Sequence, residues 1–356
     1  MRVLIALWLI LFSLGCDQQI KTEKKTQRKL SNIWIEDILL DSILSTRTID
    51  VIDSNVYYGA QDGRIGAFLE DGRHVSDRYH LDSIYPSFRS SAFNGKSLFY
   101  LSIESPTLLY KIEKNQKLNA YTEANLVYKE NHPKAFYDSM DFWDEKEGIA
   151  IGDPTDNCMS IIITRDGGET WTKLSCEVLP KIEEGEAAFA ASDTNIAIVG
   201  DHTWVATGGK ASRVLYSPNR GKTWDVFNTP IAQGKETTGI YSIDFYDAQH
   251  GFAIGGDYTK PDDSLANKIR TSNGGKTWKR VADGKSPGYR SCVQYIPGRK
   301  GRELVAVGFK GIDYSDDAGE HWTHLSDESF YTIRFLNDTI AYAAGKGRIS
   351  KLTFRE

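Results

Sequence analysis

Arginine and aspartate recur at related places along this chain of 356 residues, and both side chains can bind or transform charged ligands. Arg47, Arg89 and Arg290 each stand directly before a Ser or Thr, while Asp153 and Asp257 each follow a short apolar run. Paired guanidinium groups suit carboxylate or phosphate ligands. Paired carboxylates suit glycoside hydrolysis or a hard cation. Either chemistry requires a fold that brings these distant segments together.

Four copies of the pattern Ser/Thr-x-Asp/Asn-x-Gly-x-x-Trp indicate a repeated hairpin. The Asp or Asn side chain can accept backbone N–H bonds inside a turn, and Gly takes the positive-φ position. The Trp is expected to pack against a neighbouring sheet. We therefore assign a structural role to the Asp/Asn and Trp positions, which are Asp166 and Trp171, Asn219 and Trp224, Asn273 and Trp278, and Asp317 and Trp322.

Short strand-like segments precede these hairpins and extend the repeat over most of the chain. Six of them align with Ser or Thr as the third residue: 46–48, 88–90, 137–139, 240–242, 289–291 and 330–332. A seventh copy is expected near 186–191, and the run 195–201 is read as the second strand of that repeat. A small residue suits the crowded axis on which the inner strands of a β-propeller converge.

The repeat spacing of roughly 40–55 residues matches one four-stranded blade per copy. The sequence therefore predicts an all-β fold, a seven-bladed β-propeller, with six or eight blades as alternatives. The last repeat, 330–354, has room for only three strands. Residues 33–40 have no blade of their own, so we expect this N-terminal strand to close the last blade.

The N-terminal residues are typical of an export signal rather than of the fold. Residues 1–15 contain one positive charge and an apolar run shorter than the ~20 residues of a membrane-spanning helix. They lead to Cys16, which we expect to be lipidated, and residues 16–31 are expected to form a flexible, Lys-rich tether. Residues 32–356 form the predicted propeller domain.

The remaining cysteines are Cys158, Cys176 and Cys292. Cys158 and Cys176 flank one hairpin at nearly equal distances, and an exported protein would allow a disulfide between them. The sequence leaves that pairing open, because it does not give the strand register. Cys292 lies in an apolar strand and is expected to be a small buried side chain.

In a propeller, the aligned strand ends meet at a central rim, where ligands bind. The residues expected there are Arg47, Arg89, Asp138, Asp153, Asp201, Asp257, Arg290, Arg334 and Tyr241. These side chains could form a ligand pocket. They could equally pair with one another and fix the register of neighbouring blades. Both interpretations stay open at this point.

The octamers resemble the Asp-box, or BNR, repeat of sialidases, sortilin-type receptors and Ycf48-like photosystem II assembly factors. Phrases such as Gly152-Asp-Pro154 and Gly288-Tyr-Arg-Ser-Cys292 are similar to Ycf48-like BNR-repeat proteins of Bacteroidetes. The resemblance implies a binding or assembly scaffold. Such proteins often carry the name oxidoreductase, but this chain has no G-x-G-x-x-G after a strand and no C-x-x-C, so we expect no cofactor.

Two functions follow as hypotheses. The first is a non-catalytic scaffold in the bacterial cell envelope, monomeric and lipid-anchored, that binds an envelope protein or an anionic or glycan ligand through its central rim. The alternative is a glycoside hydrolase, sialidase-like or with two carboxylates. The net charge of −5 argues against nucleic acid, which requires a basic face. No metal site is expected.

Overall fold

The computed structural model describes residues 28–114 and 123–356, so the predicted signal peptide and Cys16 lie outside the described residues. The described ranges consist of strands, turns and loops and contain no helix, and their order of elements is all-β. Consequently, none of the described residues belongs to a helix long and apolar enough to span a membrane.

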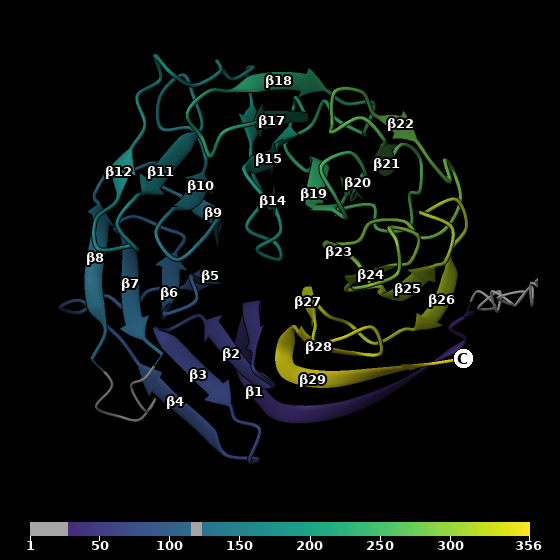
Figure 1. Ribbon diagram of the computed structural model, residues 1–356, viewed down its shortest axis with the longest axis horizontal. Coiled ribbons are helices and arrows are strands. Elements are labelled where there is room, and N and C mark those ends of the chain that lie inside the picture. The colour runs from purple at the N-terminus through teal and green to yellow at the C-terminus, as the bar shows by residue number, and fades with distance from the viewer. Residues whose placement is uncertain (1–27, 115–122) are drawn as a thin grey trace, which may run out of the picture.

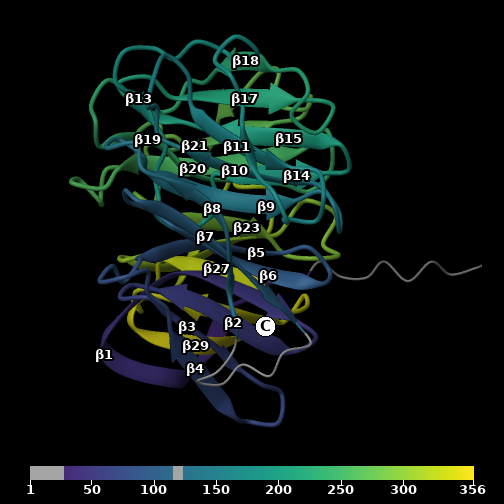
Figure 2. The ribbon, with the colours of Figure 1, turned by 90° about the vertical axis from the view of Figure 1, so that its left-hand side faces the viewer.

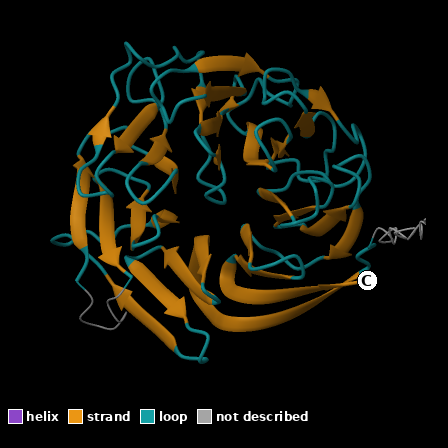
Figure 3. Ribbon diagram, in the orientation of Figure 1, coloured by secondary structure: helices purple, strands orange, loops and turns teal. Residues whose placement is uncertain are grey.

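Antiparallel sheets stand side by side around a common axis, with their innermost strands toward the centre (Figures 1 and 3). Figure 2 shows the same ring from the side, with the sheets stacked across the view. Four of these sheets have four strands each. They are formed by β5 (Phe88–Phe93), β6 (Ser97–Ser102), β7 (Thr107–Glu113) and β8 (Asn125–Glu130); by β9 (Tyr137–Phe142), β10 (Gly148–Gly152), β11 (Ser160–Thr164) and β12 (Thr172–Lys173); by β14 (Ile196–Val199), β15 (His202–Ala206), β17 (Arg213–Ser217) and β18 (Asp225–Asn228); and by β23 (Cys292–Tyr295), β24 (Leu304–Gly308), β25 (Gly311–Ser315) and β26 (Thr323–Ser326).

A fifth sheet has six strands, because two short strands extend its inner edge. Its order is β13 (Glu186–Ala187), β16 (Gly208–Gly209), β19 (Thr238–Phe245), β20 (Gly251–Asp257), β21 (Lys268–Thr271) and β22 (Lys279–Arg280). The segment predicted to hold the seventh inner strand therefore begins in this sheet, and the chain then crosses to the neighbouring sheet at β14.

The largest sheet joins the two ends of the described chain. Its order is β27 (Thr332–Phe335), β28 (Ile340–Ala344), β29 (Lys346–Arg355), β1 (Asn32–Ile52), β2 (Asn55–Ala60), β3 (Arg64–Phe68) and β4 (His74–Arg78). The first part of β1 pairs with β29, from Asn32↔Arg355 to Ser45↔Lys346. The rest of β1 pairs with β2. Residues 33–40 thus lie beside the C-terminal strand, as the sequence analysis expected of a closing strand.

The small residues of the aligned segments lie in the crowded centre. Their third positions are all buried, with at most 2% of the surface exposed: Thr48, Ser90, Ser139, Ser242, Ser291 and Thr332. Larger side chains would not fit where the inner strands converge. The hydroxyl groups of four of them, Thr48, Ser242, Ser291 and Thr332, form hydrogen bonds there.

Each of the four Asp-box turns connects the two outermost strands of its sheet and touches the preceding sheet. In each turn the Asp or Asn Oδ1 accepts the backbone N–H four residues on, at 2.9–3.0 Å. Gly168 and Gly319 have φ of +81° and +88°, and an added Cβ would lie 2.2 Å from Phe99 and from Phe252 in the preceding sheets. Glycine is therefore required both for the turn and for the close approach.

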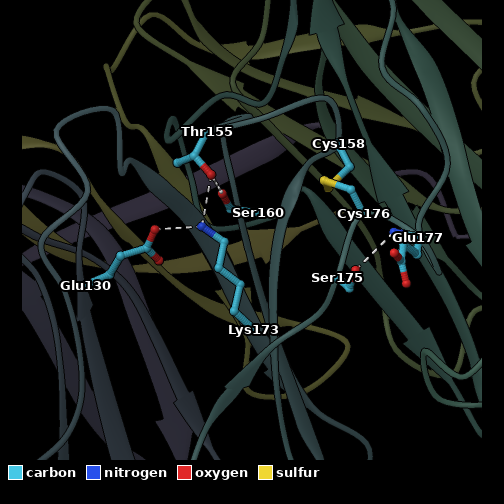
Figure 4. The surroundings of a disulfide bond; sticks show 8 residues. All are labelled: Glu130, Thr155, Cys158, Ser160, Lys173, Ser175, Cys176 and Glu177. Carbon is cyan, nitrogen blue, oxygen red and sulfur yellow. Dashed lines mark hydrogen bonds and ion pairs between the residues drawn. A yellow bond between two sulfur atoms is a disulfide. The ribbon is translucent and has the colours of Figure 1, made fainter.

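A disulfide joins Cys158 and Cys176, 18 residues apart, across the segment that carries β11 and β12 (Figure 4). Beside it, Lys173 Nζ donates to Glu130 Oε1 at 2.6 Å and to Thr155 Oγ1 at 3.0 Å. The sequence had left this pairing open. Cys292 is completely buried in the inner strand β23.

Candidate functional site

A cavity of about 530 Å³, here called cavity one, opens at the end of the ring where the inner strands begin and the second strands end. Four of the predicted rim residues line it, from four different sheets: Arg47, Arg89, Asp153 and Tyr241. Its other lining residues are Phe136, Ala187, Ala188, Phe189, Ala190, Ala191, Glu236, Tyr258, Tyr289, Ser291, Phe309 and Tyr331. Cavity one therefore combines two cations with a predominantly aromatic wall.

Within residues 28–114 and 123–356, the two arginines of cavity one have no carboxylate partner in an ion pair. The Arg47 guanidinium lies over the Tyr331 ring, 4.0 Å from its centroid, and Nη1 donates to Ala191 O at 3.1 Å. Its Nε is buried and has no hydrogen-bond partner among the described residues. Arg89 Nη1 reaches Ala190 O at 3.5 Å. Burial lowers the pKa of both guanidinium groups, because low-polarity surroundings disfavour the charged form.

Two carboxyl groups adjoin these arginines, but they differ in access. Asp153 faces cavity one, its Oδ1 accepts Ala188 N–H at 2.8 Å, and burial raises its pKa to about 6. Asp138 on β9 has no exposed surface. Burial first, and the charge of Asp153 second, raise the pKa of Asp138 well above its usual range. Asp138 is thus a buried group behind the wall, not part of the lining.

The inner end of cavity one is closed by residues 187–194, which we call the axial segment. Figure 1 shows this chain leading into β14 near the centre of the ring. Asp193 accepts Thr48 Oγ1–H at 2.7 Å and Ser91 N–H at 3.0 Å, from two different inner strands. Ser192 O accepts Thr332 Oγ1–H at 2.9 Å, from a third. The axial segment is therefore bound to inner strands on several sides and fills the axis.

The sequence of the axial segment suits this position. Residues 187–194 read Ala-Ala-Phe-Ala-Ala-Ser-Asp-Thr, so most side chains are small enough for the centre of the ring. Hydroxyl and carboxyl groups at its end satisfy donors and acceptors of the buried inner strands, as buried polar groups require. Thr194 Oγ1, for example, donates to Ser242 Oγ at 2.8 Å.

The axial segment also explains why the prediction for Asp201 is wrong. The run 195–201 was read as a second strand, but β14 is the innermost strand of its sheet. Asp201 therefore lies in the turn after β14, at the end of the ring opposite cavity one. It is exposed there and accepts Arg220 Nε–H at 2.6 Å, which belongs to an Asp-box turn.

Three further rim candidates lie outside cavity one. Arg290 is buried and forms an ion pair with Asp313, at 2.6 Å between Nη2 and Oδ2. The partner is not one of the predicted rim residues: Asp313 lies on β25, the third strand of the sheet that Arg290 precedes. Asp257 lies near the mouth, but its Oδ1 accepts Thr259 Oγ1–H at 2.6 Å. Arg334 points into the opposite end of the axis, where Nη2 donates to Asp193 O at 2.9 Å.

That opposite end holds a second cavity of about 340 Å³, called cavity two. Its charged lining residues are Asp50, Asp141, Asp193, Asp244 and Arg334. Burial raises the pKa of Asp193 to about 7 and the pKa values of Asp141 and Asp244 to about 6. Among the described residues, no group of three or more His, Cys, Asp or Glu side chains is arranged to hold a metal ion.

The sequence analysis missed most of the aromatic wall. The alignment of the inner-strand segments places Tyr331 at the rim, but Tyr289 was passed over in favour of the neighbouring Arg290. Tyr258 and Phe309 directly follow second strands, as Asp153 does, so the same alignment would have found them. They are 47% and 38% exposed and form part of the mouth. Phe189 could not be found this way, because it belongs to the axial segment.

Comparison with known proteins supports the fold and the repeat. A family model described as BNR/Asp-box repeat matches residues 162–173, which include the first Asp-box. No curated protein matches the chain.

Among solved structures, one described as YCF48 bound to D1 peptide has a TM-score of 0.63 at 12% identity, over 92% of this chain and 96% of its own. YCF48 from Cyanidioschyzon merolae has a TM-score of 0.60 at 13% identity, over 90% and 98% of the two chains. The WD40 β-propeller domain of Doa1 has a TM-score of 0.60 at 11% identity, over 91% and 97%. The chain therefore contains a BNR/Asp-box repeat and has a β-propeller fold that resembles that of Ycf48.

Proposed function

We propose that this protein is a non-catalytic scaffold that binds a segment of a protein partner in cavity one. The observation that carries the proposal is the pair Arg47 and Arg89, partly buried and without carboxylate partners among the described residues, in an aromatic cavity of about 530 Å³. Ligand sites commonly have volumes of about 300–1,000 Å³. A Ycf48 structure of similar fold holds a peptide, which supports a polypeptide ligand here.

We further infer that the ring has seven blades. The seven-stranded sheet divides within β1, whose first part pairs with β29 and whose second part pairs with β2. On this division it contributes two four-stranded blades, β27-β28-β29-β1 and β1-β2-β3-β4. The four four-stranded sheets and the sheet containing β19–β22 supply the other five.

The alternative, a glycoside hydrolase, has less support. Two catalytic carboxyl groups would have to flank a bound sugar at roughly 5–10 Å from each other. Asp138 has no exposed surface and Asp257 is bonded to Thr259, so Glu236 is the one lining residue that could act as a second carboxyl group beside Asp153. No hydrogen bond or ion pair in the described part of the chain joins Glu236 to Asp153 or to the two arginines. A binding function requires no such pair. We therefore prefer the scaffold and expect a glycan-hydrolysis screen of the same protein to show no turnover.

We also propose that the protein is exported, anchored through a lipid on Cys16 and monomeric. The position of Arg28 fits an N-terminal anchor: it donates to Glu303 at 3.0 Å and to Asp338 O at 2.6 Å. Both partners lie between first and second strands, at the cavity-two end of the ring. A tether that leaves from there would keep the mouth of cavity one free for a partner. Mass spectrometry of the mature N-terminus, with Cys16→Ala as the control, tests the anchor.

The binding proposal is tested by affinity capture from envelope extract with the full chain. The double variant Arg47→Met/Arg89→Met removes both charges and keeps apolar bulk, while Arg73→Met removes a 67% exposed arginine far from cavity one. We expect the unaltered chain and Arg73→Met to capture the same partner, and the double variant to lose it at least tenfold. Equal capture by the double variant would contradict the proposal, provided that its circular dichroism spectrum is unchanged.

A further inference from the structure

Cavity one is closed at its inner end. The axial segment forms its floor through Ala187–Ala191, and Arg47 and Arg89 donate to the carbonyl groups of Ala191 and Ala190. The same segment continues to Asp193 in cavity two and is hydrogen-bonded to the surrounding inner strands. Backbone therefore occupies the axis. An extended polypeptide cannot thread through the ring, so it can offer cavity one only a chain end or a side chain.

Two arginines, Arg47 and Arg89, place positive charge at the floor of cavity one. The Arg47 guanidinium stacks on the Tyr331 ring and donates one hydrogen bond to Ala191 O. Its buried Nε–H has no hydrogen-bond acceptor among the described residues. Arg89 makes only its 3.5 Å contact with Ala190 O. Neither forms an ion pair within the described part of the chain. Buried guanidinium groups with unused donors favour an anion that accepts charge-assisted hydrogen bonds.

The same cavity limits how much negative charge the ligand can carry. Two carboxyl groups, Asp153 and Glu236, line cavity one together with the two arginines, so its charged groups already balance when both carboxyl groups are ionised. A second negative charge on the ligand would be repelled by these carboxylates. A monoanionic carboxylate therefore matches the floor better than a dianionic phosphate does.

The wall above the floor is apolar and aromatic. Phe189 stacks on Tyr241 with ring centroids 4.0 Å apart, and Tyr289 meets Tyr241 edge-on at 4.8 Å. Phe309 packs beside Tyr289 at 5.3 Å and reaches the mouth. Such a wall gains free energy by covering a large apolar or aromatic side chain, through burial of its surface and ring contacts.

We infer that cavity one takes the free carboxyl terminus of a partner polypeptide, with its last side chain apolar or aromatic. The terminal carboxylate lies between Arg47 and Arg89 at the floor, and the last side chain packs on the wall formed by Phe189, Tyr241, Tyr289 and Phe309. The preceding residues leave through the mouth. This inference rests on the proposed function and specifies which part of the partner enters.

The test uses the full chain and fluorescein-labelled pentapeptides Gly-Ser-Gly-Ser-X, in which X is each of the 20 amino acids. Every peptide is made as the free acid and as the C-terminal amide, and binding is measured by fluorescence anisotropy. We expect acids with large apolar or aromatic X to bind, and their amides to bind at least tenfold more weakly. Arg47→Met/Arg89→Met should lose acid binding, and Arg73→Met should retain it.

Two results would overturn the inference: acid and amide peptides that bind equally, or no binding by any acid peptide. Because this comparison uses the unaltered chain, a misfolded variant cannot decide it. N-acetylphenylalanine that binds as tightly as the best pentapeptide would point to a small free acid and overturn the polypeptide source. If partner capture still depends on Arg47 and Arg89 while acids and amides bind alike, the proposed function stands and this inference fails.

Discussion

At the scale of single residues, the two ends of the axis differ in how their charges are balanced. Cavity one has two arginines without ion pairs, whereas cavity two gathers four aspartates around Arg334. Arg334 lies 3.9 Å from Asp193 and lowers the pKa of its neighbours, but burial outweighs it. The carboxyl groups of cavity two therefore resist ionisation, and their protonation is coupled to folding.

Asp141 provides a test of this coupling. Its pKa rises from 3.8 to about 6 in the folded protein, so the fold holds its proton more tightly than the unfolded chain does. The resulting stability is fully present below pH 4 and is lost as the pH rises through 6. In Asp141→Asn, Oδ1 can still accept Phe142 N–H. We expect this variant to gain about 1–3 kcal/mol at pH 7.5 and to show a flatter pH dependence in urea unfolding.

Asp225→Asn, which changes an exposed aspartate on β18, is the matched control. It should leave the difference in unfolding midpoint between pH 5 and pH 7.5 unchanged. If Asp141→Asn showed the same pH dependence as the unaltered protein, the raised pKa of Asp141 would be contradicted.

At the scale of elements, local patterns carried the predictions that succeeded. The Asp-box octamers mark hairpins because turn geometry depends on neighbouring residues only, and the family match at residues 162–173 confirms the first one. Arg47, Arg89 and Tyr241 line one cavity because equivalent ends of inner strands meet in one place, while their role in binding a ligand stays a prediction. In these cases, spacing along the chain was sufficient.

The predictions that failed depended on contacts that spacing does not encode. The run 195–201 looks like a second strand, and only the docking of the axial segment makes β14 the inner one. The ion pair of Arg290 with Asp313 joins the start of an inner strand to the third strand, and the sequence gives no such pairing. As a result, Asp201 and Arg290, which were predicted at the central rim, lie outside cavity one.

The disulfide is an element-scale feature whose effect can be measured. Cys158 and Cys176 close a loop of 18 residues around the hairpin of β11 and β12. Loop closure restricts the unfolded chain, and for this length the expected stabilisation is about 3 kcal/mol. We expect Cys158→Ala/Cys176→Ala to lower the free energy of unfolding in urea by about that amount. A reductant should destabilise the unaltered protein, leave the double variant unaffected, and thereby exclude a general effect of the reagent.

At the scale of the whole molecule, β1 is the strand that brings the first and last strands of the described chain into one sheet. Its first part is the outer strand beside β29, and its second part is the inner strand of the next set of strands. Arg47 stands directly after the change of partner, so the strand that pairs with β29 also places one of the two floor cations of cavity one. The fold and the proposed binding site therefore depend on the same strand.

Removal of the outer part of β1 should open the ring without touching any residue of cavity one. A variant that begins at Thr46 loses the pairs from Asn32↔Arg355 to Ser45↔Lys346 and leaves the ten-residue strand β29 as an exposed edge. Unpaired edges associate with one another, so we expect aggregation on size-exclusion chromatography and a lower melting temperature. A variant that begins at Arg28 keeps these pairs, the buried Leu30 and the Arg28–Glu303 ion pair, and should behave as the intact protein. A synthetic peptide of residues 31–45 should restore the shorter variant; an unchanged melting temperature without the peptide would contradict the closing role of β1.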